Sequence, residues 1–375
     1  MCLSLLILIN ANTLRLSPEM TTTRREPDDT LTALRQQLYQ DMLPLNLTPL
    51  WEVLHALVPP QPTSPCVSTL WKYEQVKPFL KRAGEAITAD EAVRRVLILE
   101  NPALRGQSAV TQSLYAGLQL ILPGEVAPSH RHTQSALRFI VEGEGAYTAV
   151  DGERTTMHPG DFIITPSWTW HDHGNEANEP VVWLDGLDIP MIRFFDAGFA
   201  ENDTSKSQHI VRSEGSSFAR YGNNMAPVRA DAPYGATSPI FSYPFERSRE
   251  ALHRLERDAP VDAWDGIKLR YINPATGGSP MPTMATFMQR LPPGFDGLAW
   301  RQTDGAVYSV VEGSGTAHMD GPTGPVRFDF EARDHFVVPS WQTLRLASTA
   351  GCVLFSYSDR PVHQALGIHR EERLS

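Results

Sequence analysis

The sequence predicts a mainly β protein made of two copies of a small β-barrel module, preceded by a helical arm. From about residue 92 the chain breaks into short apolar runs rich in β-branched and aromatic residues, which glycine and proline separate. Many short strands at near-regular spacing favour a sandwich or barrel over a βαβ fold. Two short motifs each occur twice in this part of the chain. Repetition of this kind indicates a duplicated module.

The helical arm is expected to cover residues 30–91. Residues 30–43 place apolar side chains on one helical face, and residues 49–58 form a second amphipathic helix that begins at proline. Helical character returns near 74–84, where Gly84 is the expected terminator. We expect the arm to cover a barrel edge or to contact another subunit.

Residues 1–29 are expected to be disordered or to be a misassigned start, with translation beginning at Met20 as one possibility. Their apolar run is too short for a transmembrane helix, and no basic residue precedes it as in a signal peptide.

The net charge of -10 gives no general attraction to nucleic acid or to acidic membranes. The cysteines are three, widely spaced and without a pairing pattern, which suits the cytoplasm: Cys2, Cys66 and Cys352.

The first barrel module is expected at residues 92–190 and the second at 267–360. A connection over 191–266, with a helix at 246–258, lies between them, and 361–375 form a C-terminal tail. The strands predicted in the first module are 93–99, 114–122, 137–141, 146–150, 162–165 and 181–184.

The repeat is visible in two motifs. Val141–Gly145 (VEGEG) returns at Val311–Gly315 (VEGSG), a shift of 170, and Pro166–Trp168 (PSW) returns at Pro339–Trp341, a shift of 173. The difference of three residues fits a loop insertion at 321–325 (GPTGP) in the second copy.

Four histidines concentrate the chemistry in the first module. His130 and His132 are two residues apart, and His171 and His173 repeat that spacing. On a strand, alternate side chains share a face, so each pair presents both rings to one side. The pattern fits a metal site or a surface cluster of polar strand residues, and the flanking glycines and prolines favour the metal.

The two histidine segments resemble the signature motifs of the cupin superfamily, and the duplication resembles a bicupin. The motifs read G-x5-H-x-H from Gly124 and G-x5-P-x4-H-x3-N from Gly160. The resemblance implies antiparallel strands of a jelly-roll barrel with the histidines pointing into its mouth. This chain departs from the usual pattern because residues 133–137 contain no carboxylate and because Trp168 stands where glycine is usual.

We therefore expect His130, His132 and His171 to hold the metal, although an exchange of roles between His171 and His173 stays open. Three neutral imidazoles leave about three open positions in an octahedral site, which suits a chelating substrate together with O₂, as in non-haem Fe(II) oxygenases. Zn, Mn, Ni or Cu also bind imidazole, so ligand type alone does not select iron.

The second module has lost these ligands. Trp300, Gln302 and Leu344 occupy the corresponding positions, so the second barrel is expected to be structural and metal-free. His318 and His335 lie off the ligand positions and are expected to be ordinary polar residues.

Further motifs are spread over residues 30–365: VRRV from Val93, NP at Asn101, YAGLQ from Tyr115, PSHRH from Pro128, RFIVEGEG from Arg138, WLDGLDIP from Trp183, RYINPATGG from Arg270 and VPSW from Val338. Together these motifs resemble the gentisate 1,2-dioxygenase family. This family and its salicylate- and 1-hydroxy-2-naphthoate-cleaving relatives are Fe(II) bicupins that open an aromatic ring between its carboxyl- and hydroxyl-bearing carbons.

The resemblance implies a substrate pocket beside the metal. Arg138 follows His132 by six residues and shares its face if the chain stays extended, so it can bind a substrate carboxylate with its planar, always charged fork. By resemblance, Arg94 and Gln119 also contact the substrate, and Tyr115 and Gly117 line the ring pocket. Tyr115 favours gentisate over salicylate, because the salicylate-cleaving relative carries tryptophan there.

His173 and Asp185 are the expected catalytic pair. The resemblance gives Asp185 a place in the acid–base network, in which it orients His173, and His173 then exchanges protons with the substrate hydroxyls. A turn role for Asp185 and surface roles for Arg94 and Arg138 are the alternatives. Arg95 points to the opposite face from Arg94 and is not expected in the site.

The expected function is conversion of gentisate and O₂ to maleylpyruvate by a cytoplasmic homotetramer with one Fe(II) per chain. The alternatives are cleavage of 1-hydroxy-2-naphthoate or salicylate on the same fold, a non-catalytic bicupin that binds a metal or a small acid, and a Zn or Mn cupin isomerase.

Overall fold

The computed structural model describes residues 29–229, 236–321 and 324–375, and the chain forms two units, 1–61 and 62–375. The described residues of the first unit, 29–61, form the helical segments α1 (Asp29–Met42), the 3-10 turn η1 (Leu43–Leu45) and α2 (Leu50–Leu57). Both helices predicted here are confirmed. The expectation for residues 1–29 lies, except for Asp29, outside the described residues.

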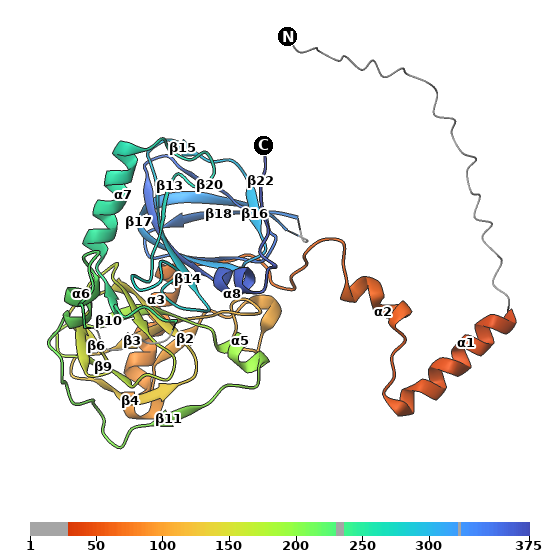
Figure 1. Cartoon of the computed structure of the whole chain (residues 1–375), viewed down its shortest axis with the longest axis horizontal. Helices are drawn as coiled ribbons and strands as arrows, with labels where there is room; N and C mark the ends of the chain where they lie inside the picture. Colours follow the sequence, from red (N-terminus) through yellow and green to blue (C-terminus); the bar gives the residue numbers. More distant parts are fainter. Residues whose placement is uncertain (1–28, 230–235, 322–323) are drawn as a thin grey trace, which may run out of the picture. The chain divides into compact units, whose positions relative to one another are not determined.

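The first barrel of the second unit consists of two antiparallel sheets (Figure 1). One sheet has the order β12-β8-β5-β10-β3-β2 and the other β11-β4-β9-β6-β7. Their bounds are β2 (Val96–Ile98), β3 (Tyr115–Ile121), β4 (Val126–His132), β5 (Ala136–Glu142), β6 (Ala146–Val150), β7 (Glu153–Thr156), β8 (Phe162–Thr165), β9 (His171–Asn175), β10 (Val181–Leu187), β11 (Ala200–Asn202) and β12 (Ser242–Tyr243). The six strands predicted in this module are present, with ends within three residues of those expected.

The second barrel repeats this arrangement from β13 onward. Its largest sheet has the central order β1-β19-β17-β21-β14-β13, and β16 pairs with β22. The bounds are β1 (Thr69–Trp71), β13 (Ile267–Arg270), β14 (Ala285–Leu291), β15 (Phe295–Asp296), β16 (Trp300–Gln302), β17 (Ala306–Gly321), β18 (Gly324–Glu331), β19 (His335–Val338), β20 (Arg345–Ser348), β21 (Cys352–Ser358) and β22 (Glu371–Arg373). The insertion predicted at 321–325 falls at the tip of the β17–β18 hairpin, and its residues 322–323 lie outside the described part of the chain.

Helices flank the two barrels. The helix predicted at 246–258 is confirmed as α7. The helical segments of the second unit are α3 (Tyr73–Ala86), α4 (Ala89–Ala92), η2 (Pro102–Leu104), α5 (Ile189–Phe194), α6 (Ser216–Tyr221), α7 (Phe245–Asp258) and α8 (Arg360–Ala365).

Gly84 does not end α3, so that prediction was wrong. The helix continues to Ala86, and a Cβ on Gly84 would lie 3.0 Å from Leu120 Cδ2 on β3. The missing side chain therefore lets the helix approach the sheet closely, which is a second use of glycine besides helix termination.

The two barrels share one hydrophobic core. Phe139 on β5 stacks on Phe355 of β21 with ring centroids 4.2 Å apart, and Phe162 of β8 lies 5.6 Å from the same ring. Tyr357 donates a hydrogen bond of 2.7 Å to the carbonyl of Tyr115, which ties β21 to β3. Because apolar surface of both barrels is buried at this contact, removing the second barrel would expose the sheet that supports the first.

The repeated motifs form equivalent turns. Gly143 and Gly313 have φ of 79° and 75°, and a Cβ on either would come within 2.3 Å and 2.2 Å of a backbone oxygen. Trp168 and Trp341 also have positive φ, 58° and 61°. A left-handed conformation explains why glycine is usual at the position of Trp168.

Each barrel mouth carries an added strand held in the same way. In the first barrel Arg131 pairs with Glu201 of β11 and stacks on Trp168. In the second barrel Arg301, Glu372 of β22 and Trp341 make the equivalent contacts. The tail expected at 361–375 thus supplies the strand that closes the second mouth.

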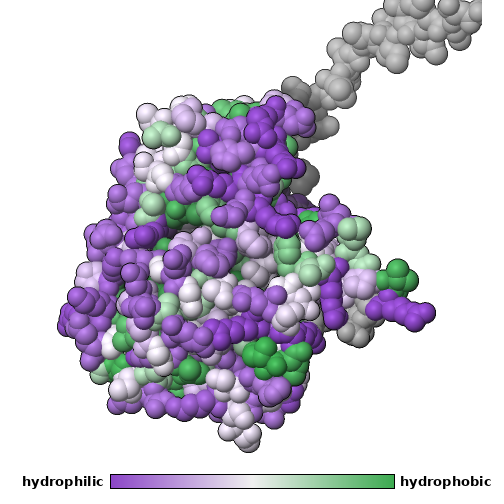
Figure 2. All heavy atoms as spheres, turned by 90° about the vertical axis from the view of Figure 1, so that its left-hand side faces the viewer, coloured by the Kyte–Doolittle hydropathy of each residue, from purple (hydrophilic) through white to green (hydrophobic). Residues whose placement is uncertain are grey.

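Figure 2 views the molecule from the side on which α7 lies in Figure 1. Hydrophilic side chains dominate this face, and hydrophobic ones gather in smaller patches. Among the helices of the described residues, none combines the length and the apolar character that crossing a membrane requires.

Candidate metal centre and active site

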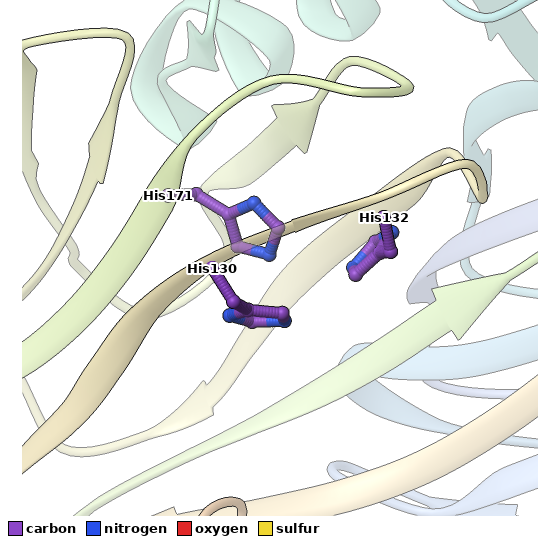
Figure 3. Close-up of side chains that lie close together, drawn as sticks. All are labelled: His130, His132 and His171. Atoms are coloured by element: carbon purple, nitrogen blue, oxygen red, sulfur yellow. The ribbon is translucent and has the colours of Figure 1, made fainter. Parts of the chain in front are cut away.

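Two antiparallel strands bring the three candidate metal ligands together. His130 on β4 lies directly opposite His171 on β9, and His132 follows two residues later on the same face of β4. The three rings converge on one point (Figure 3). Their centroids are 4.2 to 5.2 Å apart, and one ligand nitrogen from each lies within 4.8 Å of the others.

Backbone carbonyls orient the rings. Nδ1 of His132 lies 2.9 Å from the carbonyl of Gln134, and Nδ1 of His171 lies 2.8 Å from that of Thr169. A carbonyl only accepts, so Nδ1 carries the proton and Nε2 keeps its lone pair. Nε2 of His171 is buried and has no hydrogen-bond partner among the described residues. An orphaned lone pair beside two further imidazoles fits a bound metal ion.

Burial keeps these imidazoles neutral. It lowers the pKa of His130 to about 3 and that of His132 to about 4, and it holds the pKa of His171 well below its usual value. Positive charge on Arg94 and Arg138 adds to the effect. The rings are therefore ready to bind a metal without first losing protons.

Arg94 contacts the ring of a candidate ligand, His130, directly. Its Nη2 donates to the carbonyl of Pro128 at 2.6 Å and lies 2.6 Å from Nδ1 of His130. Nδ1 of His130 lies 3.3 Å from the carbonyl of Pro128. This contact is longer than the carbonyl contacts of His132 and His171, so the backbone holds the His130 ring less tightly. Arg95 instead forms a buried two-point ion pair with Glu125, away from the site as expected.

Arg138 and Asp185 form a buried pair on neighbouring strands. They are cross-strand neighbours on β5 and β10, with Arg138 Nε 3.6 Å from the carboxylate. Arg138 also donates to Thr165 Oγ1 at 2.6 Å, while its Nε has no hydrogen-bond partner in the described structure. Burial raises the pKa of Asp185 to about 6, against the lowering effect of Arg138. A buried guanidinium with spare donors suits an anionic ligand.

His173 lies apart from the three candidate ligands, with its ring centroid 5.8 Å from that of His171. Its Nδ1 lies 3.0 Å from Thr148 Oγ1, and its buried Nε2 has no partner among the described residues. Asp185 does not orient it by a hydrogen bond, contrary to expectation. Asp185 instead accepts from Trp183 Nε1 at 3.0 Å, two residues earlier on the same face of β10, and the cross-strand register places Arg138 beside it.

The expected ring-pocket residues are neighbours on β3. Tyr115, Gly117 and Gln119 are all buried, and because they are every second residue of β3 they lie on the same face of the strand. A Cβ on Gly117 would lie 2.5 Å from Val96 Cγ1 and 2.8 Å from the hydroxyl of Tyr115. The glycine therefore leaves the space that the tyrosine hydroxyl occupies.

The second barrel reproduces the geometry without the ligands. Trp300 lies opposite Leu344, as His130 lies opposite His171. The shifts of 170 and 173 read from the sequence thus correspond to true structural equivalence. His335 differs from an ordinary polar residue, because it is fully buried and neither of its nitrogens has a partner among the described residues.

Sequence reasoning missed several supporting residues. Thr148 and Thr165 contact His173 and Arg138, and the carbonyls of Pro128, Gln134 and Thr169 face the ligand rings. The only sequence signal for Thr148 is its place on a strand that can pair with the second histidine segment.

This geometry defines the class of protein. Two antiparallel barrels, of which one gathers three imidazoles at its mouth, make a two-barrel cupin with a candidate metal site. Residues 117–187 match the family model described as "Cupin domain".

The relatives define the family. A gentisate 1,2-dioxygenase from Aquipseudomonas alcaligenes is 52% identical over 343 residues, covering 92% of this chain and 97% of the relative. One from Streptomyces sp is 37% identical and covers 91% and 96%. The salicylate 1,2-dioxygenase of Pseudoaminobacter salicylatoxidans, solved as adducts with gentisate, has a TM-score of 0.85 at 32% identity and covers 94% and 96%. The chain belongs to the gentisate 1,2-dioxygenase family and is a dioxygenase on the bicupin fold.

Proposed function

We propose that this chain is an Fe(II) enzyme that cleaves gentisate with O₂ to give maleylpyruvate. The bond between the carboxyl-bearing and the adjacent hydroxyl-bearing ring carbon breaks, and both oxygen atoms enter the product. The observation that carries the proposal is the convergence of three neutral imidazoles beside the buried Arg138. The relatives of this chain with 52% and 37% identity are gentisate 1,2-dioxygenases.

His130, His132 and His171 are the proposed ligands, with one iron per chain. Iron bound there supplies Lewis acidity and a route for electrons from the ring to O₂. Gentisate suits such a site because its carboxylate and ortho hydroxyl present two oxygens for chelation. Three protein ligands leave coordination positions for those oxygens and for O₂.

Arg138 and Arg94 are the proposed carboxylate-binding residues. Arg138 is buried and its Nε makes no hydrogen bond in the described structure, whereas Arg94 is half-buried beside the ring of His130. Charge-assisted hydrogen bonds are strongest under these conditions. Tyr115, Gly117 and Gln119 are proposed to fit the aromatic ring.

His173 is the proposed proton acceptor for a substrate hydroxyl. Thr148 holds its Nδ1, and its free Nε2 is therefore the atom available to exchange a proton. Asp185 acts on this site through Arg138, whose charge it compensates.

Isotope labelling tests the proposal. Protein loaded with Fe(II) under nitrogen is mixed with gentisate and ¹⁸O₂, and the product is analysed by mass spectrometry. We expect stoichiometric oxygen uptake and two labelled oxygens in maleylpyruvate. Binding of gentisate without turnover would contradict the proposal and support a non-catalytic binding protein.

Salicylate and 1-hydroxy-2-naphthoate are the competing substrates. The family includes relatives named for both, including a 1-hydroxy-2-naphthoate enzyme from Nocardioides sp. at 37% identity. We propose gentisate first because its second hydroxyl makes the ring easier to oxidise. A kcat/KM for either competitor above that for gentisate would reverse this order.

A homotetramer in the cytoplasm is proposed as the working form. Helices α1 and α2 expose apolar side chains, and Cys66 and Cys352 are free thiols. The exposed residues include Leu31, Leu34, Leu38, Trp51 and Leu57. Removing residues 1–61 is expected to reduce the number of chains per particle, obtained by light scattering as the measured mass divided by the mass of the shortened chain, and an unchanged number would rule out a role of residues 1–61 in assembly.

A further inference from the structure

The second barrel contains a cavity of about 310 Å³ that the proposed reaction does not use. Cationic and apolar side chains line it together, among them Ile267, Lys268, Arg270, Phe287, Trp300 and Arg360. It opens beside the position at which the second barrel lacks a metal site, because Trp300 corresponds to His130.

The cavity is the structural counterpart of the substrate side of the first barrel. Lys268 pairs with Gln289 across β13 and β14, as Val96 pairs with Gln119 across β2 and β3. Lys268 and Arg270 are two residues apart on β13 and share a face. Lys268 and Arg270 therefore occupy the positions of Val96 and Ile98, on the strand beside the one that carries the ring-pocket residues of the first barrel.

Three donors of the cavity are suited to an anion. The Lys268 ammonium lies 5.3 Å and 5.0 Å from the ring centroids of Phe287 and Trp300. Trp300 is 4% exposed, and its Nε1 has no partner among the described residues. Arg270 is exposed, donates to the carbonyl of Gly277, and pairs with no carboxylate in the described part of the chain.

Acidic residues limit the charge of a ligand. Asp265 lies 2.9 Å from Lys268, and Arg360 lies 3.2 Å from the buried Asp304 and 3.7 Å from Glu371. Most cations of the cavity are thus compensated, and Arg270 supplies the spare positive charge. A polyanion would meet these carboxylates, whereas a single carboxylate needs one spare cation.

We propose that this cavity binds a small organic monoanion, a carboxylate on a flat apolar body, without a metal. The carboxylate accepts from Lys268 and Arg270, and the apolar body contacts Phe287 and Trp300. The site is distinct from the metal centre and does not depend on the activity proposed above.

Benzoate is a suitable probe because it lacks the ortho hydroxyl needed for chelation. Calorimetric titration of the Fe(II)-loaded full chain under nitrogen is expected to show two sites per chain. Arg138→Met should remove the site in the first barrel. Lys268→Met and Arg270→Ser should each weaken the other site at least tenfold, whereas Arg257→Ser, an exposed arginine on α7, should change neither.

Because the Arg270 side chain is exposed, Arg270→Ser should not disturb folding, so weaker binding in this variant can be assigned to the site. The thermal unfolding of each variant is measured as a check. A single benzoate site that Arg138→Met removes would overturn the inference. So would a second site that keeps its affinity in both Lys268→Met and Arg270→Ser, or the absence of benzoate binding. Oxygen uptake with gentisate is measured separately, so failure of the second site leaves the proposed reaction intact.

Discussion

At the scale of single residues, burial prepares His130, His132 and His171 for metal binding. Unfolded histidine has a pKa near 6.5, whereas burial lowers these values in the fold. Below pH 6.5 the unfolded chain binds protons that the folded chain does not, so stability rises with pH across this range. The same shift means that protons compete poorly with the metal.

Metal retention should therefore persist in mild acid. We expect Co(II) affinity, measured by competition with a chelator of known pH dependence, to change less than about threefold between pH 7.5 and 5.5. Ligands with the ordinary histidine pKa would lose affinity steeply over this interval. A loss approaching about tenfold per ligand, the value for an ordinary histidine pKa, would contradict the lowered pKa values.

The pair of Arg138 and Asp185 leads to a second prediction at the residue scale, the pH dependence of the KM for gentisate. The pKa of Asp185 is about 6, so its carboxylate is ionised at pH 7.5 and compensates Arg138, and it becomes neutral on acidification. The uncompensated guanidinium then binds the substrate carboxylate more tightly. We expect the KM for gentisate to fall, by roughly tenfold at most, between pH 7.5 and 5.5.

Asp185→Asn should have the lower KM at both pH values and remove this dependence. Glu179→Gln, an exposed carboxylate in the turn before β10, is the matched control and should behave as the unchanged chain. A KM that is independent of pH in the unchanged chain would show that Asp185 does not control the charge of Arg138.

At the scale of elements, close packing of β2 on β3 shapes the ring pocket. Gly117→Ala places a methyl group 2.5 Å from Val96 Cγ1. Overpacking of this kind costs about 1–3 kcal/mol. We expect a lower midpoint of thermal unfolding and a lower kcat/KM, both recovered in part by adding Val96→Ala. No recovery in the double variant would mean that Val96 is not the obstacle.

The segment that follows β11 is hydrogen-bonded to β9, which carries the candidate ligand His171, and to the neighbouring β6. Gln208 donates to Asp172 through its backbone N–H at 2.9 Å and its side chain at 3.1 Å, and it also contacts Ala149 and Gly152. Asp172 is the residue between His171 and His173. This segment therefore holds the second pair of histidines in register.

Gln208→Ala should lower the free energy of unfolding by about 1–3 kcal/mol, because contacts to a buried carboxylate are lost. It should also weaken metal affinity by roughly tenfold, as loss of supporting contacts does in other metal sites. Gln75→Ala, an exposed glutamine on α3, is the control. Equal metal affinity in both variants would limit Gln208 to a role in stability.

Much of this site could be predicted from the sequence, namely the features that depend on local rules. Features that depend on contacts between distant segments could not. Histidine spacing and strand alternation are local rules, so the convergence of His130, His132 and His171 could be expected. The partners of Arg94 and Asp185 depend on cross-strand register and rotamers, which one chain segment does not reveal. Gly84 was misjudged for the same reason, since its role depends on Leu120 of another element.

At the scale of the whole molecule, duplication has given two barrels with different tasks. The first keeps three imidazoles, and the second places Trp300, Gln302 and Leu344 at the same positions. The two barrels share one core, in which Phe139 stacks on Phe355. We infer that the second barrel supports the first and needs no metal of its own.

Metal stoichiometry measured together with oxygen uptake tests the central claim most directly. The chain is titrated with Fe(II) under nitrogen, and gentisate-dependent uptake is recorded at each metal-to-chain ratio. We predict that uptake rises linearly and stops at one iron per chain, and that His171→Ala abolishes both binding and uptake. Uptake that keeps rising to two irons per chain, or that survives in His171→Ala, would contradict a single three-histidine iron centre in the first barrel.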